Sequence, residues 1–222
     1  LDWEVQPFSD DERDKAIAEF ITEQLKGIEN LDDVFMDLLD AIGKGISVME
    51  IEWGVEAGAN VILGIEYVHP KKLTWDCETD EMKICTKEYP SGISFPENKF
   101  VIHRYKDAAG IIPDSTMIEF IESNKTTSVE IYETLARYCD EQMSKAILGQ
   151  TLSSDSGGGS YAQGKVHNEV RHDLTQADAK ALATTIRRDI IRPLVEYNFG
   201  YDADIPFFAF DSREAEDLQS IV

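Results

Sequence analysis

The hydrophobic period of the chain changes at Ile46, and this change limits the possible folds more than any other feature. Before it, apolar residues recur at helical spacing, which predicts two helices, 9–27 and 30–45. The first is expected to begin at a capping box formed by Ser9 and Glu12. From Ile46 onward, apolar and polar residues alternate, as they do in strands that bury one face. The first half of the chain therefore predicts helices packed on an antiparallel sheet, an α+β fold.

Six segments with this alternation are expected to form strands. We expect strands that follow each other in the sequence to pair as an antiparallel meander. Cys77 and Cys85 flank the turn between two of them, and one alternative is that they face each other. The expected strands are 1–5, 46–55, 61–67, 73–77, 82–86 and 100–105.

The regular pattern breaks after Gly110. A strand, a helix, a flexible loop rich in Ser and Gly, a long helical region and a final short strand are expected beyond it. Thr175 and Asp178 are expected to cap a second helix inside the long helical region, and Pro193 is expected to kink it. The five segments are 111–121, 127–149, 153–160, 161–198 and 205–210.

The charge of the chain restricts its function. The sequence has 43 Asp and Glu against 21 Lys and Arg, a formal net charge of -22. Such a surface repels phosphate, which argues against a protein that holds DNA or RNA by its backbone, and it disfavours anionic membranes. No apolar run of about 18 residues predicts a membrane span. Because Leu1 is not Met and already lies in an expected strand, we expect the natural N-terminus to lie upstream.

Cysteine and histidine form no recognisable metal or disulfide pattern. The three cysteines include no CxxC pair and are expected to be small buried residues. His167 and His172 are five residues apart, so on one helix they point in different directions and do not share a metal ion. The sequence therefore predicts no metal site, and it indicates no cofactor.

Catalytic patterns are weak as well. Glycines 157–159 precede a helix, but they lack the spacing of a phosphate-binding loop, and Asp155 would repel a phosphate. The serines of this loop have no base fixed beside them. Carboxylate pairs such as Asp10 and Asp11 lie at helix starts, where capping and the helix dipole account for them. No catalytic residue is predicted.

One long segment is not acidic, since residues 161–200 contain six basic and five acidic side chains. Arg187 and Arg188 are adjacent in this segment, and arginine is well suited to donating in interface ion pairs. We predict that both form ion pairs at a subunit interface. The alternative is that both lie on a solvated face of the helix.

Several stretches of the sequence are distinctive when they are taken together and in order. They are LDWEV at 1–5, SVMEIEW at 47–53, Ile-Pro at 112–113, YCDEQMSKAIL at 138–148, GQTLSSDSGGGSYAQGKVHNEVR at 149–171 and RPLVEYNFG at 192–200. In this order they resemble the portal proteins of Mu-like phages and prophages, and the resemblance covers nearly the whole chain.

The resemblance implies a structural protein and not an enzyme. Portal proteins form a ring, normally of twelve copies, at one capsid vertex of the virion, after assembly in the bacterial cytoplasm. The large terminase subunit pumps double-stranded DNA through the ring, and head and neck proteins attach to it. An acidic channel suits this role, because its wall gives phosphates no place to bind tightly.

The resemblance also implies a division of the chain. Residues 1–110 correspond to a wing of helices and sheet, and residues 111–222 to the strand, long helices and C-terminal strand and tail of the portal core. In the family a helical stem and a clip lie between these regions. Here Gly110 runs directly into Ile111, so we expect both the stem and the clip to be absent.

A mobile loop of portal proteins precedes a long helix and touches the DNA in the channel. By its position, the Ser- and Gly-rich loop of this chain corresponds to that tunnel loop, although such sequences also serve as plain connectors. The expected tunnel-loop residues are Ser153, Ser154, Asp155, Ser156, Gly157, Gly158 and Gly159.

Two other classes of function are retained as alternatives. The first is a nucleic-acid-processing enzyme of the packaging apparatus, which would need a metal-binding carboxylate cluster that the sequence does not display. The second is an acidic adaptor that binds one protein partner.

Overall fold

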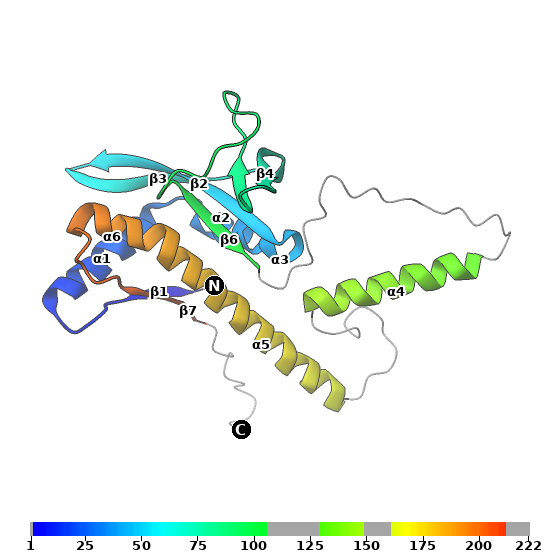
Figure 1. Ribbon diagram of the computed structural model, residues 1–222. Coiled ribbons are helices and arrows are strands. Elements are labelled where there is room, and N and C mark those ends of the chain that lie inside the picture. Colours follow the sequence, from blue (N-terminus) through cyan, green and yellow to red (C-terminus); the bar gives the residue numbers. More distant parts are fainter. Residues whose placement is uncertain (1, 106–128, 149–160, 212–222) are drawn as a thin grey trace, which may run out of the picture. The chain divides into compact units, whose positions relative to one another are not determined.

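The computed structural model describes residues 2–105, 129–148 and 161–211 (Figure 1). Contacts group the chain into two units, the first made of Leu1–Ala108 with Asp178–Val222 and the second of Ala109–Ala177. The expected division at residue 110 gives two consecutive regions. In this grouping, by contrast, the residues from Asp178 onward belong with the N-terminal half of the chain. The elements are helices and small antiparallel sheets, which confirms the predicted α+β class.

The main sheet of the first unit has three strands, with β2 (Ile46–Glu56) between β3 (Ala59–Tyr67) and β6 (Phe100–Arg104). Both pairings are antiparallel. The predicted meander is wrong, because β4 (Leu73–Asp76) and β5 (Glu81–Ile84) form a separate hairpin. This hairpin shares a small apolar cluster with the outer face of the main sheet, so it packs on the sheet instead of extending its edge. The cluster contains Ile46, Val48, Val68, Met82, Ile84 and Phe100.

The hairpin of β2 and β3 has a tight two-residue turn and one irregularity. Ala57 and Gly58 both have positive φ, 49° and 86°, which matches the right-handed twist of a hairpin. The register shifts near Leu63, which is the extra residue of a bulge in β3. Leu63 lies over Gly54, where a Cβ would come within 2.7 Å of the leucine side chain. Glycine at this position therefore lets the bulge close over β2.

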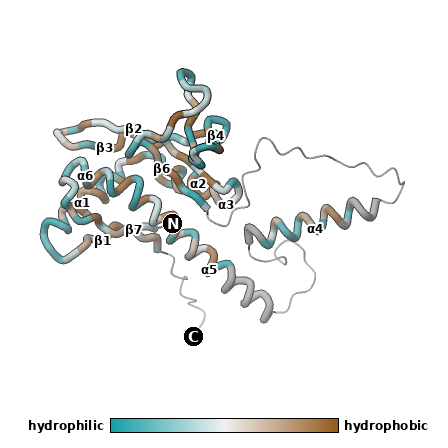
Figure 2. Tube along the Cα trace, in the orientation of Figure 1, coloured by the Kyte–Doolittle hydropathy of each residue, from teal (hydrophilic) through white to brown (hydrophobic). Residues whose placement is uncertain are grey.

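The opposite face of the sheet is covered by helices, and the apolar core lies between them (Figure 2). Helix α1 (Glu12–Gly27) and helix α2 (Leu31–Leu39) confirm the helical prediction, and a short α3 (Ala41–Lys44) follows. The Ser9–Glu12 capping box is wrong. Helix α1 begins only at Glu12, and the Ser9 hydroxyl donates to the Asp14 carboxylate.

The helical region of the C-terminal half is continuous. Helix α5 (Tyr161–Ile186) passes into a π-helical segment, Arg187–Ile191, and then into α6 (Arg192–Phe199). The predicted cap at Thr175 is wrong, because its hydroxyl bonds back to a carbonyl one turn earlier and the helix runs on. Pro193 lies near the start of α6, just after the wide π-helical turns, where a missing N–H is tolerated, and the kink expected there stays a prediction.

The part of this helical region that belongs to the first unit completes the core. Six of its aliphatic residues are at most 1% exposed, and they share one core cluster with residues of α1, α2 and the sheet. Strand β1 (Trp3–Gln6) pairs with β7 (Phe207–Phe210), so both predicted terminal strands are confirmed and lie side by side. The six aliphatic residues are Leu182, Ile186, Ile190, Ile191, Leu194 and Val195.

In the second unit, α4 (Val129–Leu148) confirms the predicted helix. Its side chains Leu135, Tyr138 and Met143 are more than half exposed. The strand expected at 111–121 lies outside the described residues.

The predictions for the cysteines are wrong. Cys77 and Cys139 are exposed, and Cys85 is half-buried. Cys77 lies in the turn after β4, whereas the Cys85 amide bonds to the carbonyl of Lys72. The ladder of this hairpin therefore places Cys85 beside Lys72 and not opposite Cys77.

Candidate functional site

The expected tunnel loop, Ser153 to Gly159, lies outside the described residues and stays a prediction. The two arginines predicted for a subunit interface are described, and both have partners within the chain. Arg187 donates from Nε to the carbonyl of Pro206 and from Nη2 to that of Ile205, both at 2.9 Å. Its guanidinium also lies 4.8 Å from the centre of the Phe207 ring. Arg187 thus ties the π-helical segment to the start of β7.

Arg188 and its neighbour Asp189 bind the outer edge of β6. Arg188 donates to the carbonyl of Ile102 at 2.6 Å, and Asp189 accepts from the amide of the same residue at 2.9 Å. The two side chains also pair with each other, and this hydrogen bond raises the pKa of Arg188. Both backbone groups of Ile102 are satisfied without another strand, so the pair closes this edge. A contact of either arginine with a second subunit stays a prediction.

Two further polar contacts fasten the end of β6 to the same helical region. His103 is only 2% exposed, and its Nδ1 lies 2.9 Å from the Thr185 hydroxyl. Burial lowers the pKa of His103, and the Arg188 charge lowers it further. The Tyr105 hydroxyl donates to Asp178 at 3.0 Å. The sequence analysis missed these contacts, although the 7- and 4-residue spacing of 178, 185 and 189 places three polar side chains on one helical face.

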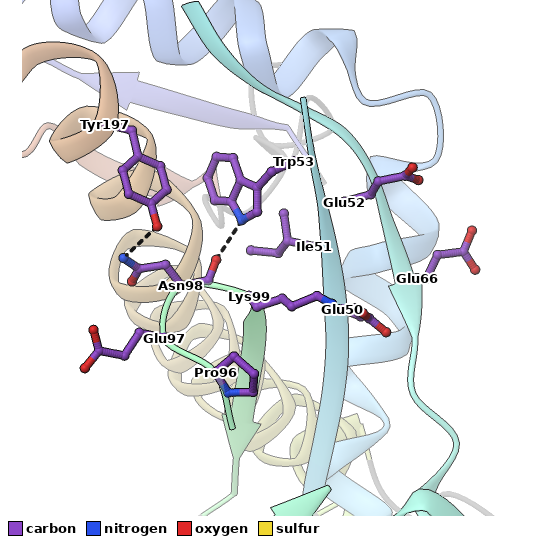
Figure 3. Close-up of a pocket in the computed structure, with 10 residues that line it drawn as sticks. All are labelled: Glu50, Ile51, Glu52, Trp53, Glu66, Pro96, Glu97, Asn98, Lys99 and Tyr197. Carbon is purple, nitrogen blue, oxygen red and sulfur yellow. Dashed lines mark hydrogen bonds and ion pairs between the residues drawn. The ribbon is translucent and has the colours of Figure 1, made fainter. Parts of the chain in front are cut away.

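A groove opens where β6 ends but β2 continues (Figure 3). The last backbone bond between them joins the amide of Ile51 to the carbonyl of Lys99 at 2.8 Å. Beyond it the Trp53 indole donates to the Asn98 carbonyl at 2.7 Å, and Asn98 donates to the Tyr197 hydroxyl at 3.1 Å. The rings of Trp53 and Tyr197 meet edge to face, with centres 5.2 Å apart. We call this space of about 640 Å³ the β2-edge groove.

The other side of β2 at this groove is acidic. Glu50 lies directly opposite Glu66 on β3, and Glu52 follows on the same face, as Figure 3 shows. Like charges opposite each other in a sheet are unfavourable. Lys99 pairs with Glu50 at 2.8 Å, and both of these side chains are close to half exposed. The groove therefore joins an aromatic wall to a negative one.

The described residues offer no support for metal chemistry or a membrane span. In the described ranges, no group of three or more His, Cys, Asp or Glu side chains is placed to hold a metal ion. Within the same ranges, no helix combines the length and the apolar character that crossing a bilayer requires.

Comparisons with known proteins agree on one family. The sequence pattern of the family described as "Portal protein of Mu bacteriophage" matches residues 1–107 and 105–222. The "Mu-like prophage FluMu protein gp29" of Haemophilus influenzae is 27% identical over 297 residues, which cover 99% of this chain and 56% of that protein. The "Portal protein" of Escherichia phage Mu is 25% identical over 292 residues, covering 100% of this chain and 57% of the phage protein.

The chain thus spans a little more than half the length of these relatives. Both alignments are longer than the 222 residues of the chain, so the relatives contain residues within the aligned region that this chain lacks. The family pattern itself matches in two stretches that together cover the whole chain. The chain belongs to the Mu bacteriophage portal protein family.

Proposed function

We propose that this chain is a structural subunit of a portal ring at one vertex of a phage capsid, where it surrounds the channel for DNA packaging and ejection. The observation that carries the proposal is the family match along both halves of the chain. On this proposal the protein catalyses no reaction. It acts in the virion and assembles in the cytoplasm of the bacterial host.

The proposal assigns to a stem and a clip the residues that the relatives have within the aligned region and this chain lacks. The two matched stretches meet at residues 105–107, just after β6. The polar contacts of His103 and Tyr105 hold the end of β6 on the helical region. The end of β6 is therefore fixed in the first unit, next to the point where the family match divides.

The proposed partners are other copies of the chain, the large terminase subunit, head and neck proteins, and double-stranded DNA. DNA would pass without tight binding, because a formal net charge of -22 repels phosphate. Residues 153–159 would form the loop nearest the DNA. Arg187 and Arg188 would support the ring from inside the subunit, with any contact to a neighbour added to their internal bonds.

The oligomeric mass of the full-length gene product tests the proposal. We expect mass photometry at nanomolar to micromolar concentration to show one closed assembly of about twelve subunits. A clean monomer at micromolar concentration would count against the ring. A monomer that also cleaves DNA with a divalent metal would favour the enzyme, and a monomer with one protein partner would favour the adaptor.

A further inference from the structure

Unpaired strand backbone begins at Trp53 in the β2-edge groove and continues past the groove to Val55. Backbone groups of alternate residues point to opposite neighbours in an antiparallel sheet. Because the Ile51 amide bonds toward β6, the backbone groups of Trp53 and Val55 point to the same side. There β6 has already ended, and within the described residues no backbone bond joins Trp53 or Val55 to a neighbour on that side. A strand edge of this kind is a template for another strand.

The two walls of the groove would select the side chains of an added strand. Side chains of a strand alternate between the two faces of a sheet. One face at this edge offers the rings of Trp53 and Tyr197, while the other offers Glu50, Glu52 and Glu66. A strand lying here would place alternate residues against an apolar wall and the remainder beside carboxylates.

Charge balance at the groove also points to a cationic strand. Lys99 is the basic residue among those that line the groove, and four glutamates line it too, Glu50, Glu52, Glu66 and Glu97. The ion pair of Lys99 with Glu50 is solvent-exposed, so exchanging it for another cation costs little. A strand with lysine or arginine at every second position would neutralise this face.

We propose that the β2-edge groove binds an extended segment of another protein by strand addition, and that this segment alternates basic and apolar residues. The added strand would continue the position of β6 along β2 and bond to Trp53 and Val55. This mode of recognition combines backbone bonds for affinity with alternating side-chain pockets for specificity. The inference does not depend on the ring, because every contact in it lies within one subunit.

A second copy of this chain fits the groove less well. None of its described strands contains more than one lysine or arginine, and the chain as a whole is strongly acidic. Its basic side chains between 161 and 200 lie on helices, which cannot pair with a strand edge. The occupant is therefore a basic segment of a different protein.

The test uses a labelled heptapeptide of alternating lysine and valine as the probe, with fluorescence anisotropy as the readout. We expect saturable binding that weakens as salt is added. Val55→Pro removes the amide donor at an exposed edge position, where proline is compatible with a strand. We expect this variant to bind the probe at least about tenfold more weakly. The proline removes one backbone hydrogen bond, and its ring also hinders the approach of a strand to the edge. The matched control Val55→Ala keeps the donor and should stay within about twofold.

Two more arms keep the test decisive if Val55→Pro fails to fold. A probe N-methylated at every amide has no donor left for the edge, and it should lose binding to the unmodified protein. A glutamate–valine probe should not bind, and Glu52→Gln should weaken the lysine probe about threefold. The proposal is overturned if the lysine probe does not bind, if N-methylation has no effect, or if both probe charges bind equally. It is also overturned if Val55→Pro changes the oligomeric mass without any binding of the probe, because the occupant would then be a second copy.

Discussion

Two helical segments of this protein, residues 179–195 and α4, both have apolar residues at helical spacing, but these residues are buried in the first segment and exposed on the second. The helical segment from Ala179 to Val195 buries its apolar stripe, with Leu182, Ile186 and Leu194 at most 1% exposed. On α4, by contrast, Leu135 is 57% exposed and Tyr138 58% exposed. Periodicity therefore predicts that a helix forms. Whether its apolar face is buried in a core depends on packing against elements from distant parts of the chain.

The polar residues of the two helices differ in the same way. Arg187 and Arg188 bond to carbonyls of β6 and of the segment before β7, far away in the sequence. Arg137 on α4 pairs with Glu133, one turn earlier on the same helix. Long-range bonds fix the place of a helix in the fold, whereas a pair within one turn supports only the helix itself.

The largest difference is expected between two truncations of apolar residues. Ile186→Ala should lower the free energy of unfolding by about 2–5 kcal/mol, because it leaves a cavity in a closely packed core. Leu135→Ala, its counterpart on α4, should change it by about 0.5 kcal/mol or less. Urea unfolding followed by circular dichroism measures both. Equal losses would show that α4 is also buried in the folded protein.

A smaller difference is expected between two arginines. Arg187→Ala should cost about 1–3 kcal/mol, because two partly buried carbonyls lose their donor and Phe207 loses its stacked cation. Arg137→Ala removes an exposed ion pair and should cost at most about 0.5 kcal/mol. The same unfolding assay compares them. If Arg187→Ala were as mild as Arg137→Ala, its bonds to the segment before β7 would not stabilise the unit.

The smallest effect is a pH dependence from His103. Burial lowers the pKa of His103 below its ordinary value of 6.5, so the unfolded chain takes up the proton first as the pH falls. The stability that depends on neutral His103 is therefore complete above about pH 6.5 and is lost below it, by at most about 1.4 kcal/mol per pH unit. Comparison with His103→Gln isolates this contribution from the many carboxylates. A stability difference that stays constant from pH 8 to pH 5 would contradict it.

Much of the fold follows from local sequence patterns. The helices, the hairpin around Ala57 and Gly58, and both terminal strands agree with periodicity and turn chemistry. The pairing of β6 with β2 does not, because it depends on a cluster shared by Ile46, Val48 and Phe100 that no local pattern encodes. The same holds for Cys77 and Cys85, whose surroundings follow from the register of one hairpin.

The site was harder to predict than the fold. The alternation of Glu50 and Glu52 with apolar residues was visible in the sequence. Whether these glutamates line a groove depends on where β6 ends beside β2. The one available signal was a difference in length, since β2 has 11 residues and β6 only five. A longer strand beside a shorter one leaves an open edge, but the identity of the neighbour must be known before the lengths can be compared.

Electron cryo-microscopy of the full-length gene product tests the central claim, that this chain is a portal subunit, most directly. The account predicts closed rings with a central channel, in which each subunit contains the β3–β2–β6 sheet completed by α6. Residues 153–159 are expected at the channel wall. Isolated subunits with no ring at any concentration, or rings with residues 153–159 on their outer surface, would contradict the account.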